Sequence, residues 1–179
     1  MTSWVIPIFA SRGFADLVEN ALTGIVRCGI DPGIVHVWAP PAHLDELGTL
    51  ASRYGARAFA LPPGPAQHDA PTPDSADYAT LGFRSFMGQR LPVIRDYLAQ
   101  QNFVLHADAD VSWLRNPLDY LQHVLSGSEW ACQIESVPQY PPAYSFGFYA
   151  VRPTRMTRKL INNHISRYSP ASEISDQAL

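Results

Sequence analysis

Two aspartates separated by one residue are the strongest candidates for chemistry in this sequence. Phe103–Ala107 is an apolar run that predicts a buried strand, and Asp108-Ala-Asp110 follows it directly. In open α/β sheets ligands bind outside the carboxyl ends of the strands, and in extended backbone residues i and i+2 project to the same side. Two adjacent carboxylates repel each other and need a cation, and hard divalent cations prefer oxygen ligands. The sequence therefore predicts a Mg²⁺ or Mn²⁺ site that holds a diphosphate.

The alternative for this segment is a solvated turn in which the aspartates bond local backbone amides. The metal site is favoured because the Asp108-Ala-Asp110 segment follows a strand and is itself followed by Trp113-Leu-Arg-Asn-Pro-Leu118. We expect Trp113 and Leu114 to anchor the segment in the core rather than to contact a ligand. His106 lies on the strand itself, shows no metal-ligand spacing with another histidine, and is expected to be a hydrogen-bonded sheet residue.

The segment from Asp108 to Leu118 resembles the signature of the nucleotide-diphospho-sugar transferase family, which groups with glycosyltransferase family 77. Phe83 and Arg90 match an upstream pattern of a Phe and a basic residue seven positions apart. Downstream, the resemblance continues in Phe146-Gly-Phe-Tyr-Ala-Val-Arg-Pro-Thr154 and in Asp176-Gln177. It implies an α/β fold of the GT-A type, a Rossmann-like three-layer sandwich with a mostly parallel central sheet.

The resemblance also implies roles for residues in donor binding. Asp108 would contact the ribose and help to orient the metal shell, and Asp110 would ligate the Mn²⁺ or Mg²⁺ that bridges the two phosphates. Gly147 would let the backbone approach the donor sugar closely, because it has no Cβ. Arg90 would balance the diphosphate charge, and Arg84 is a second candidate for this role. The alternatives are that both arginines are solvated helix residues and that Gly147 marks a β-bulge.

Two residues are implied as catalytic. Asp176 and Gln177 would lie beside the sugar and the acceptor, with Gln177 on the face where a retaining enzyme needs a weak nucleophile or a stabilising dipole. The implied reaction transfers a hexose or pentose, with retention, from a nucleotide diphosphate (UDP is favoured) to the hydroxyl of a glycan or other acceptor. The alternative for Asp176 is a disordered surface residue.

Two departures from the family pattern keep other hypotheses open. Ser145-Phe146 precedes the downstream glycine, where related enzymes usually have Asn or Ser next to it, and the sequence ends at Leu179, two residues after the Asp-Gln pair. We therefore expect either a truncated catalytic core or a site that a partner or second copy completes. One alternative is a catalytically incomplete domain that binds a nucleotide sugar or a protein. A nucleotidyltransferase is a weaker alternative, because no Gly-rich phosphate loop is present.

The elements that must position these residues follow from hydrophobic periodicity. In the first half, strands alternate with helices, which favours right-handed crossovers and a parallel sheet. Pro7 demotes the first strand to an edge or broken strand. In the second half, Gly88 and Pro92 are expected to split one helix. The predicted strands are 4–10, 34–39, 56–61, 103–107, 129–135 and 145–152, and the predicted helices are 14–26, 44–54, 83–101, 118–125 and 154–168, the last basic on its outer side through Arg155, Arg158 and Lys159.

Composition limits the class of protein. The 179 residues are 46% apolar and 16% charged with a formal net charge of −3, which predicts one globular domain over residues 1–179. Near-neutral charge argues against a nucleic-acid partner, and no apolar run is long enough to span a bilayer. The short Trp4–Ala10 run does not resemble a secretion signal. Cys28 and Cys132 have no metal or redox spacing and are expected to be small buried hydrophobes, so a cytoplasmic location is the default. The Pro-rich stretch 62–77 is predicted to be a loop.

Overall fold

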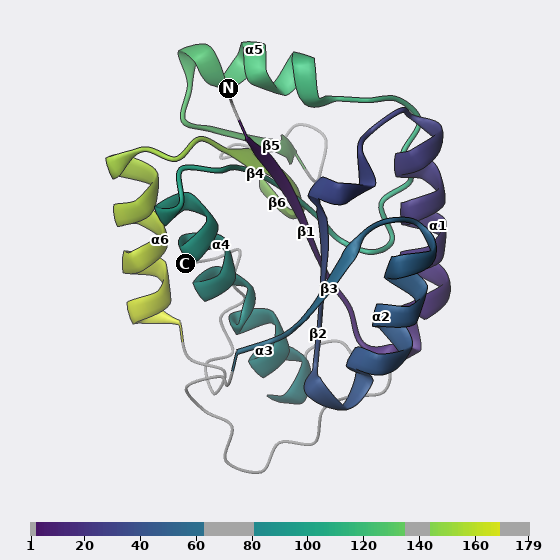
Figure 1. Cartoon of the computed structure of the whole chain (residues 1–179). Helices are drawn as coiled ribbons and strands as arrows, with labels where there is room; N and C mark the ends of the chain where they lie inside the picture. Colours follow the sequence, from purple (N-terminus) through teal and green to yellow (C-terminus); the bar gives the residue numbers. More distant parts are fainter. Residues whose placement is uncertain (1–2, 63–80, 135–143, 169–179) are drawn as a thin grey trace.

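The computed structural model describes residues 3–62, 81–134 and 144–168, and a six-stranded sheet runs through the middle of these segments (Figure 1). The strand order is β3-β2-β1-β4-β6-β5. Strands β1, β2, β3 and β4 pair in parallel, whereas β6 pairs antiparallel with both β4 and β5. The strand bounds are β1 Trp4–Phe9, β2 Val35–Ala39, β3 Arg57–Ala60, β4 Phe103–Ala107, β5 Trp130–Ile134 and β6 Tyr144–Val151.

Helices cover the two faces of this sheet and make a three-layer α/β sandwich. Buried side chains of α1, α2 and α5 pack on one face, and those of α3, α4 and α6 pack on the other. The predicted α/β class and its mostly parallel sheet are confirmed. The helix bounds are α1 Ala15–Arg27, α2 Leu44–Arg53, α3 Leu81–Gly88, α4 Arg90–Ala99, α5 Leu118–Gly127 and α6 Arg155–Arg167, with 3-10 turns at 12–14, 32–34 and 41–43.

Side-chain alternation along the strands assigns residues to the two layers. In β1, Ile6 and Ile8 belong to the core under α1 and α2, whereas Val5 and Phe9 belong to the core under α4. The same alternation in β4 sends Leu105 toward α1 and Val104 toward α4. Since His106 and Asp108 share the parity of Val104, both side chains face the α4 layer.

The prediction that Pro7 makes the first strand an edge or broken strand is wrong. Strand β1 lies in the interior of the sheet, between β2 and β4. Proline cannot donate a backbone hydrogen bond, so a central position requires that the ladder open there. The β1–β4 pairing covers only Trp4 and Val5, and the Pro7 carbonyl instead lies 3.2 Å from the His106 ring. The His106 side chain therefore takes the place of the backbone hydrogen bonds between β1 and β4 at Pro7.

Three further expectations need correction. The predicted 83–101 helix is split, but the break lies between Gly88 and Arg90, and Pro92 sits inside the first turn of α4. The first four N–H groups of a helix have no partner within it, so proline costs little there. Val26, expected on the buried face of its helix, is 45% exposed, and Leu114, expected in the core, is 92% exposed.

Most other expectations are confirmed or stay untested. Trp113 is buried in the core between the sheet and α1, and Gly29 and Gly55 end α1 and α2 with φ of +71° and +80°. Cys28 and Cys132, expected to be buried, are instead free thiols of intermediate exposure. The 62–77 stretch lies outside the described residues beyond Pro62, and the single-domain prediction stays a prediction. Within the described ranges, none of the helices has the length and hydrophobicity needed to cross a bilayer.

Candidate functional site

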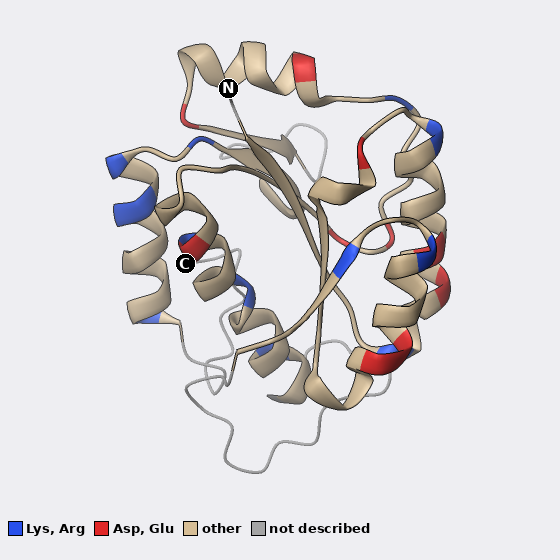
Figure 2. Ribbon diagram, viewed as in Figure 1, with Lys and Arg blue, Asp and Glu red and all other residues tan. Residues whose placement is uncertain are grey.

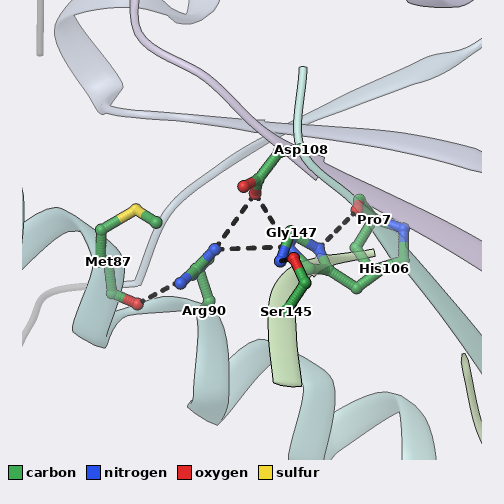
Figure 3. Close-up of polar contacts among 7 residues, drawn as sticks. All are labelled: Pro7, Met87, Arg90, His106, Asp108, Ser145 and Gly147. Carbon is green, nitrogen blue, oxygen red and sulfur yellow. Dashed lines mark hydrogen bonds and ion pairs between the residues drawn. The ribbon is translucent and has the colours of Figure 1, made fainter. Parts of the chain in front are cut away.

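The candidate site is at the carboxyl end of β4, where a buried strand delivers two polar side chains to the α4 layer. His106 is completely buried, and the side chain of Asp108 is 37% exposed. Helix α4 begins at Arg90 above this strand end, and the Arg90 side chain is 5% exposed. Three groups that can carry charge therefore meet at the edge of the sheet, two of them away from solvent (Figure 3).

Asp108 Oδ1 is the centre of this cluster. Arg90 Nη1 donates to it at 3.2 Å, and His106 Nε2 lies 3.1 Å from it. Arg90 is also fixed by a 3.3 Å hydrogen bond from its Nε to the carbonyl oxygen of Met87. Arg90 is thus not the solvated helix residue that was the alternative interpretation from sequence. Its guanidinium is turned inward and paired.

The His106 ring bridges two strands. Its Nδ1 lies 3.2 Å from the Pro7 carbonyl oxygen, which can only accept, so Nδ1 carries a proton. Its Nε2 lies 3.3 Å from Arg90 Nη1 and 3.1 Å from Asp108 Oδ1. In the neutral ring Nε2 accepts from Arg90, and in the protonated ring it donates to Asp108. In both states the ring links β1 to the Asp108 cluster.

These partners set the charge of Asp108. Burial on its own raises the pKa of the carboxyl group, but the hydrogen bond and charge of His106, together with those of Arg90, outweigh it. The net result is a pKa below its ordinary value of 3.8. Asp108 is therefore a carboxylate at neutral pH, as a metal or ribose contact requires.

Gly147 on β6 lies next to the same carboxylate. Asp108 donates its backbone N–H to the Gly147 carbonyl oxygen at 2.7 Å, and the Gly147 N–H donates to Ser145 Oγ at 3.1 Å. A Cβ at position 147 would lie only 2.9 Å from Asp108 Oδ2. The glycine is thus needed for a close approach, and on the described residues the group approached is Asp108.

Asp110 differs from Asp108 in its surroundings. The strand ends at Ala107, and the Val111 N–H donates to the Asp108 carbonyl oxygen, which makes a turn of residues 108–111. The extended backbone assumed from the sequence is therefore wrong for this segment. Asp110 is exposed, and it makes no hydrogen bond or ion pair with any residue in the described ranges.

The structure brings together Asp108, Arg90 and Gly147 and places Asp110 two residues farther on, in solvent. Asp176 and Gln177 lie outside the described residues. Sequence reasoning missed the part that His106 takes in the cluster, although a signal existed: it precedes Asp108 by two positions, and such residues share one face of a strand. Within the described ranges, no group of three or more His, Cys, Asp or Glu side chains could hold a metal by itself.

Comparisons with known proteins identify the family and the fold of the chain. A family model described as nucleotide-diphospho-sugar transferase matches residues 60–179. No protein of curated function matches the chain in sequence. Among solved structures, the chain is similar to the galactosyltransferase LgtC in complex with donor and acceptor sugar analogs, with a TM-score of 0.61 and 14% identity over 97% of this chain and 68% of that one.

Two further solved structures have the same fold at low identity. Mouse xyloside xylosyltransferase 1 aligns with a TM-score of 0.58 and 7% identity over 99% of this chain and 80% of that one. A 4-diphosphocytidyl-2C-methyl-D-erythritol synthase from Anaerococcus prevotii aligns with a TM-score of 0.55 and 10% identity over 96% and 81%. Because proteins named for different reactions share this fold, the fold alone does not identify the reaction.

Proposed function

The chain belongs to the nucleotide-diphospho-sugar transferase family, and from this membership we propose that it moves a sugar from a nucleotide diphosphate to an acceptor hydroxyl in a metal-dependent reaction. One observation carries the proposal. A carboxylate whose pKa is lowered, Asp108, stands at the carboxyl end of β4, with the exposed Asp110 two residues away. This is the edge of an α/β sheet at which ligands bind.

The residues present fit a hard divalent cation. Arg90 and His106 contact Oδ1 of Asp108. Gly147 on β6 has no Cβ that would crowd Oδ2. Asp108 and Asp110 would hold the metal through carboxylate oxygens, which Mg²⁺ and Mn²⁺ prefer. Two carboxylates leave further coordination positions to phosphate oxygens. When bound, such an ion supplies positive charge that stabilises a leaving diphosphate.

The chain's own residues prepare the site for this role. Arg90 and His106 hold the Asp108 carboxylate in one orientation and keep it ionised. A ligand held within about 0.5 Å by its supporting shell binds without reorganisation. Arg90 is proposed to act in two ways, by positioning Asp108 and by adding positive charge at the edge where the diphosphate binds.

The finer parts of the proposal rest on the sequence motif. We propose a UDP-sugar as donor, a glycan or other hydroxyl compound as acceptor, and retention at the anomeric carbon. Asp176 and Gln177 are proposed to lie beside the sugar, with Gln177 as weak nucleophile or stabilising dipole. The fold is compatible with transfer of either a hexose or a pentose, because the similar structures include a galactosyltransferase and a xylosyltransferase. A cytoplasmic location also stays a prediction.

Ligand-dependent thermal stability tests the proposed site. UDP with Mn²⁺ should raise the melting temperature, since a ligand at about 100 times its dissociation constant adds about 2.7 kcal/mol to the free energy of unfolding. EDTA and Asp110→Ala should each remove the shift. Asp119→Ala, which deletes an exposed carboxylate on α5, is the matched control and should keep it. A shift that survives both EDTA and Asp110→Ala would place the nucleotide elsewhere.

Turnover separates the proposed reaction from the alternatives. A panel of nucleotide sugars with Mn²⁺ should show release of the nucleoside diphosphate from at least one donor, and Asp110→Ala should stop it. Binding of UDP with no release from any donor would instead support a catalytically incomplete binding domain. Release of pyrophosphate from a nucleoside triphosphate would indicate a nucleotidyltransferase.

A further inference from the structure

Basic residues are concentrated in one segment of this chain. Residues 152–168 hold five of the 13 Lys and Arg and no Asp or Glu, and the rest of the chain carries eight Lys and Arg against 16 Asp and Glu. Most of this segment is helix α6. Figure 2 shows only Lys and Arg among the charged residues of α6, whereas α1 and α2 across the sheet carry Asp and Glu together with Arg. Within the described residues, α6 thus carries four basic and no acidic side chains, in a chain whose net charge is −3.

The fold turns the basic residues of α6 outward. Thr157 and Ile161 are buried and pack the helix against the body of the protein. A capping box between Thr154 and Thr157 fixes the first turn. The exposed side chains of α6 also include Asn162, Asn163 and Ser166; we call the charged and apolar ones the α6 outer face, and they are Arg155, Met156, Lys159, Leu160 and Arg167.

This face combines charge with exposed apolar surface. Arg155 and Lys159 lie one helical turn apart, as do Met156 and Leu160, which are 66% and 52% exposed. Arg155 and Lys159 make no hydrogen bond or ion pair with the residues that the structure describes. The Asp108 cluster is built from residues of α4, β4 and β6, and none of the five α6 side chains takes part in its hydrogen bonds. The α6 outer face is therefore not used by the site.

From this pairing of charge and apolar area we infer that the α6 outer face binds the surface of an anionic lipid bilayer. Arg155, Lys159 and Arg167 would contact headgroup phosphates. Met156 and Leu160 would enter the boundary between headgroups and acyl chains, as the apolar side chains of interfacial helices do. Each Lys or Arg near such a surface strengthens binding, and salt weakens it.

Two other occupants fit the face less well. A nucleic acid would neutralise the basic residues but leave Met156 and Leu160 in water, and the chain as a whole is acidic. The acidic α1–α2 side of a second copy would complement the charge, but that contact joins two different surfaces and generates open chains rather than a closed dimer. A lipid surface uses both the charge and the apolar area.

Vesicle sedimentation with the full chain tests the inference independently of any transferase activity. We expect binding to vesicles of phosphatidylcholine with phosphatidylglycerol, little binding to pure phosphatidylcholine, and loss of binding as salt rises. Arg155→Glu with Lys159→Glu should weaken the partition about 30-fold or more. Arg27→Glu with Arg53→Glu, exposed residues of α1 and α2, gives the same net charge and should bind like the parent chain.

The apolar pair gives a second, separate readout. Met156→Ser with Leu160→Ser should weaken binding to anionic vesicles while preserving its salt dependence. Melting temperatures within a few degrees of the parent would show that both double variants fold. Equal binding by the Arg155/Lys159 and the Arg27/Arg53 variants would overturn the inference, and so would absence of binding to anionic vesicles at low salt. Concentration-dependent self-association, or RNA binding, that requires Arg155 and Lys159 but not Met156 and Leu160 would also overturn it.

Discussion

Two histidine clusters lie on the same face of the sheet, and their difference shows what makes one of them a candidate site. His36 on β2 and His106 on β4 each precede another polar or aromatic side chain by two residues, and each meets a side chain of α4. The α4 partner is Tyr97 in the first cluster and Arg90 in the second. The backbone arrangement is similar, so the contrast comes from the partners.

The His36 cluster is neutral. Trp38 Nε1, which can only donate, gives a 3.0 Å hydrogen bond to Tyr97 Oη. The Tyr97 hydroxyl also makes a hydrogen bond with Nδ1 of His36. Burial, helped by the nearby charge of Arg57, lowers the pKa of His36 to about 4, and burial raises the pKa of Tyr97 to about 12. Every member is uncharged near pH 7.

The His106 cluster keeps its charges, although His106 and Arg90 are buried, because each charge has a partner. Asp108 stays ionised against Arg90 and His106, and buried charges persist only where such compensation exists. The comparison teaches that a histidine held against α4 by hydrogen bonds does not by itself mark a site. The neighbouring carboxylate, its retained charge and its partial exposure do.

The largest expected effect comes from removing one charge of the His106 cluster. Arg90→Met leaves the Asp108 carboxylate without its ion pair and should lower the free energy of unfolding by about 2 to 3 kcal/mol. This is below the 3–5 kcal/mol typical of a fully buried pair because Asp108 is partly exposed. Tyr97→Phe, the matched change in the neutral cluster, should cost only about 1 kcal/mol. Urea denaturation measures both.

A double variant provides the control for this contrast. Arg90→Met with Asp108→Asn removes both charges and should be less destabilised than Arg90→Met alone, because no unpaired carboxylate remains. If Arg90→Met proved no more costly than Tyr97→Phe, the distinction between a charged and a neutral cluster would have no energetic basis.

A smaller effect is expected at Gly147, where the charged cluster touches β6. In Gly147→Ala the new Cβ would lie 2.9 Å from Asp108 Oδ2, so the carboxylate must move. We expect a loss of about 1 to 3 kcal/mol in the free energy of unfolding and weaker binding of UDP with Mn²⁺ by calorimetry. Gly127→Ala, whose Cβ would meet no atom within 4 Å, is the control and should change neither. Unaltered binding in Gly147→Ala would show that Oδ2 does not contact the ligand.

The sequence predicted most of the fold because its strongest signals are local. Apolar periodicity located α1 and α2, and glycines with positive φ marked their ends. Pro7 was misjudged because its tolerance in β1 depends on a side chain from β4, 99 residues away. Such long-range compensation has no local signal.

The site was predicted in part for the same reason. The position of Asp108 after a buried strand is readable from the sequence, and so is its neighbour Asp110. The ion pair with Arg90 depends on how α4 crosses the sheet, and the turn at residues 108–111 depends on where β4 ends. Neither follows from residue spacing. The glycine at 147 was recognised as a close-approach position, but its partner in the structure is Asp108.

The last expected effect separates the two clusters by pH. The pKa of His36 is about 4 in the folded protein and 6.5 when unperturbed, so between these values the unfolded chain binds the proton more strongly. The stability contributed by His36 therefore falls as pH drops from about 6.5 to 4 and changes no further below that. The pKa of Asp108 lies below 3.8, so its contribution is retained above that value and lost below it. The difference in stability between the parent and His36→Gln, taken from melting curves, should change with pH only between about 4 and 6.5. The difference between the parent and Asp108→Asn should change only below pH 3.8. If both differences changed over the same pH range, the two clusters would titrate as one.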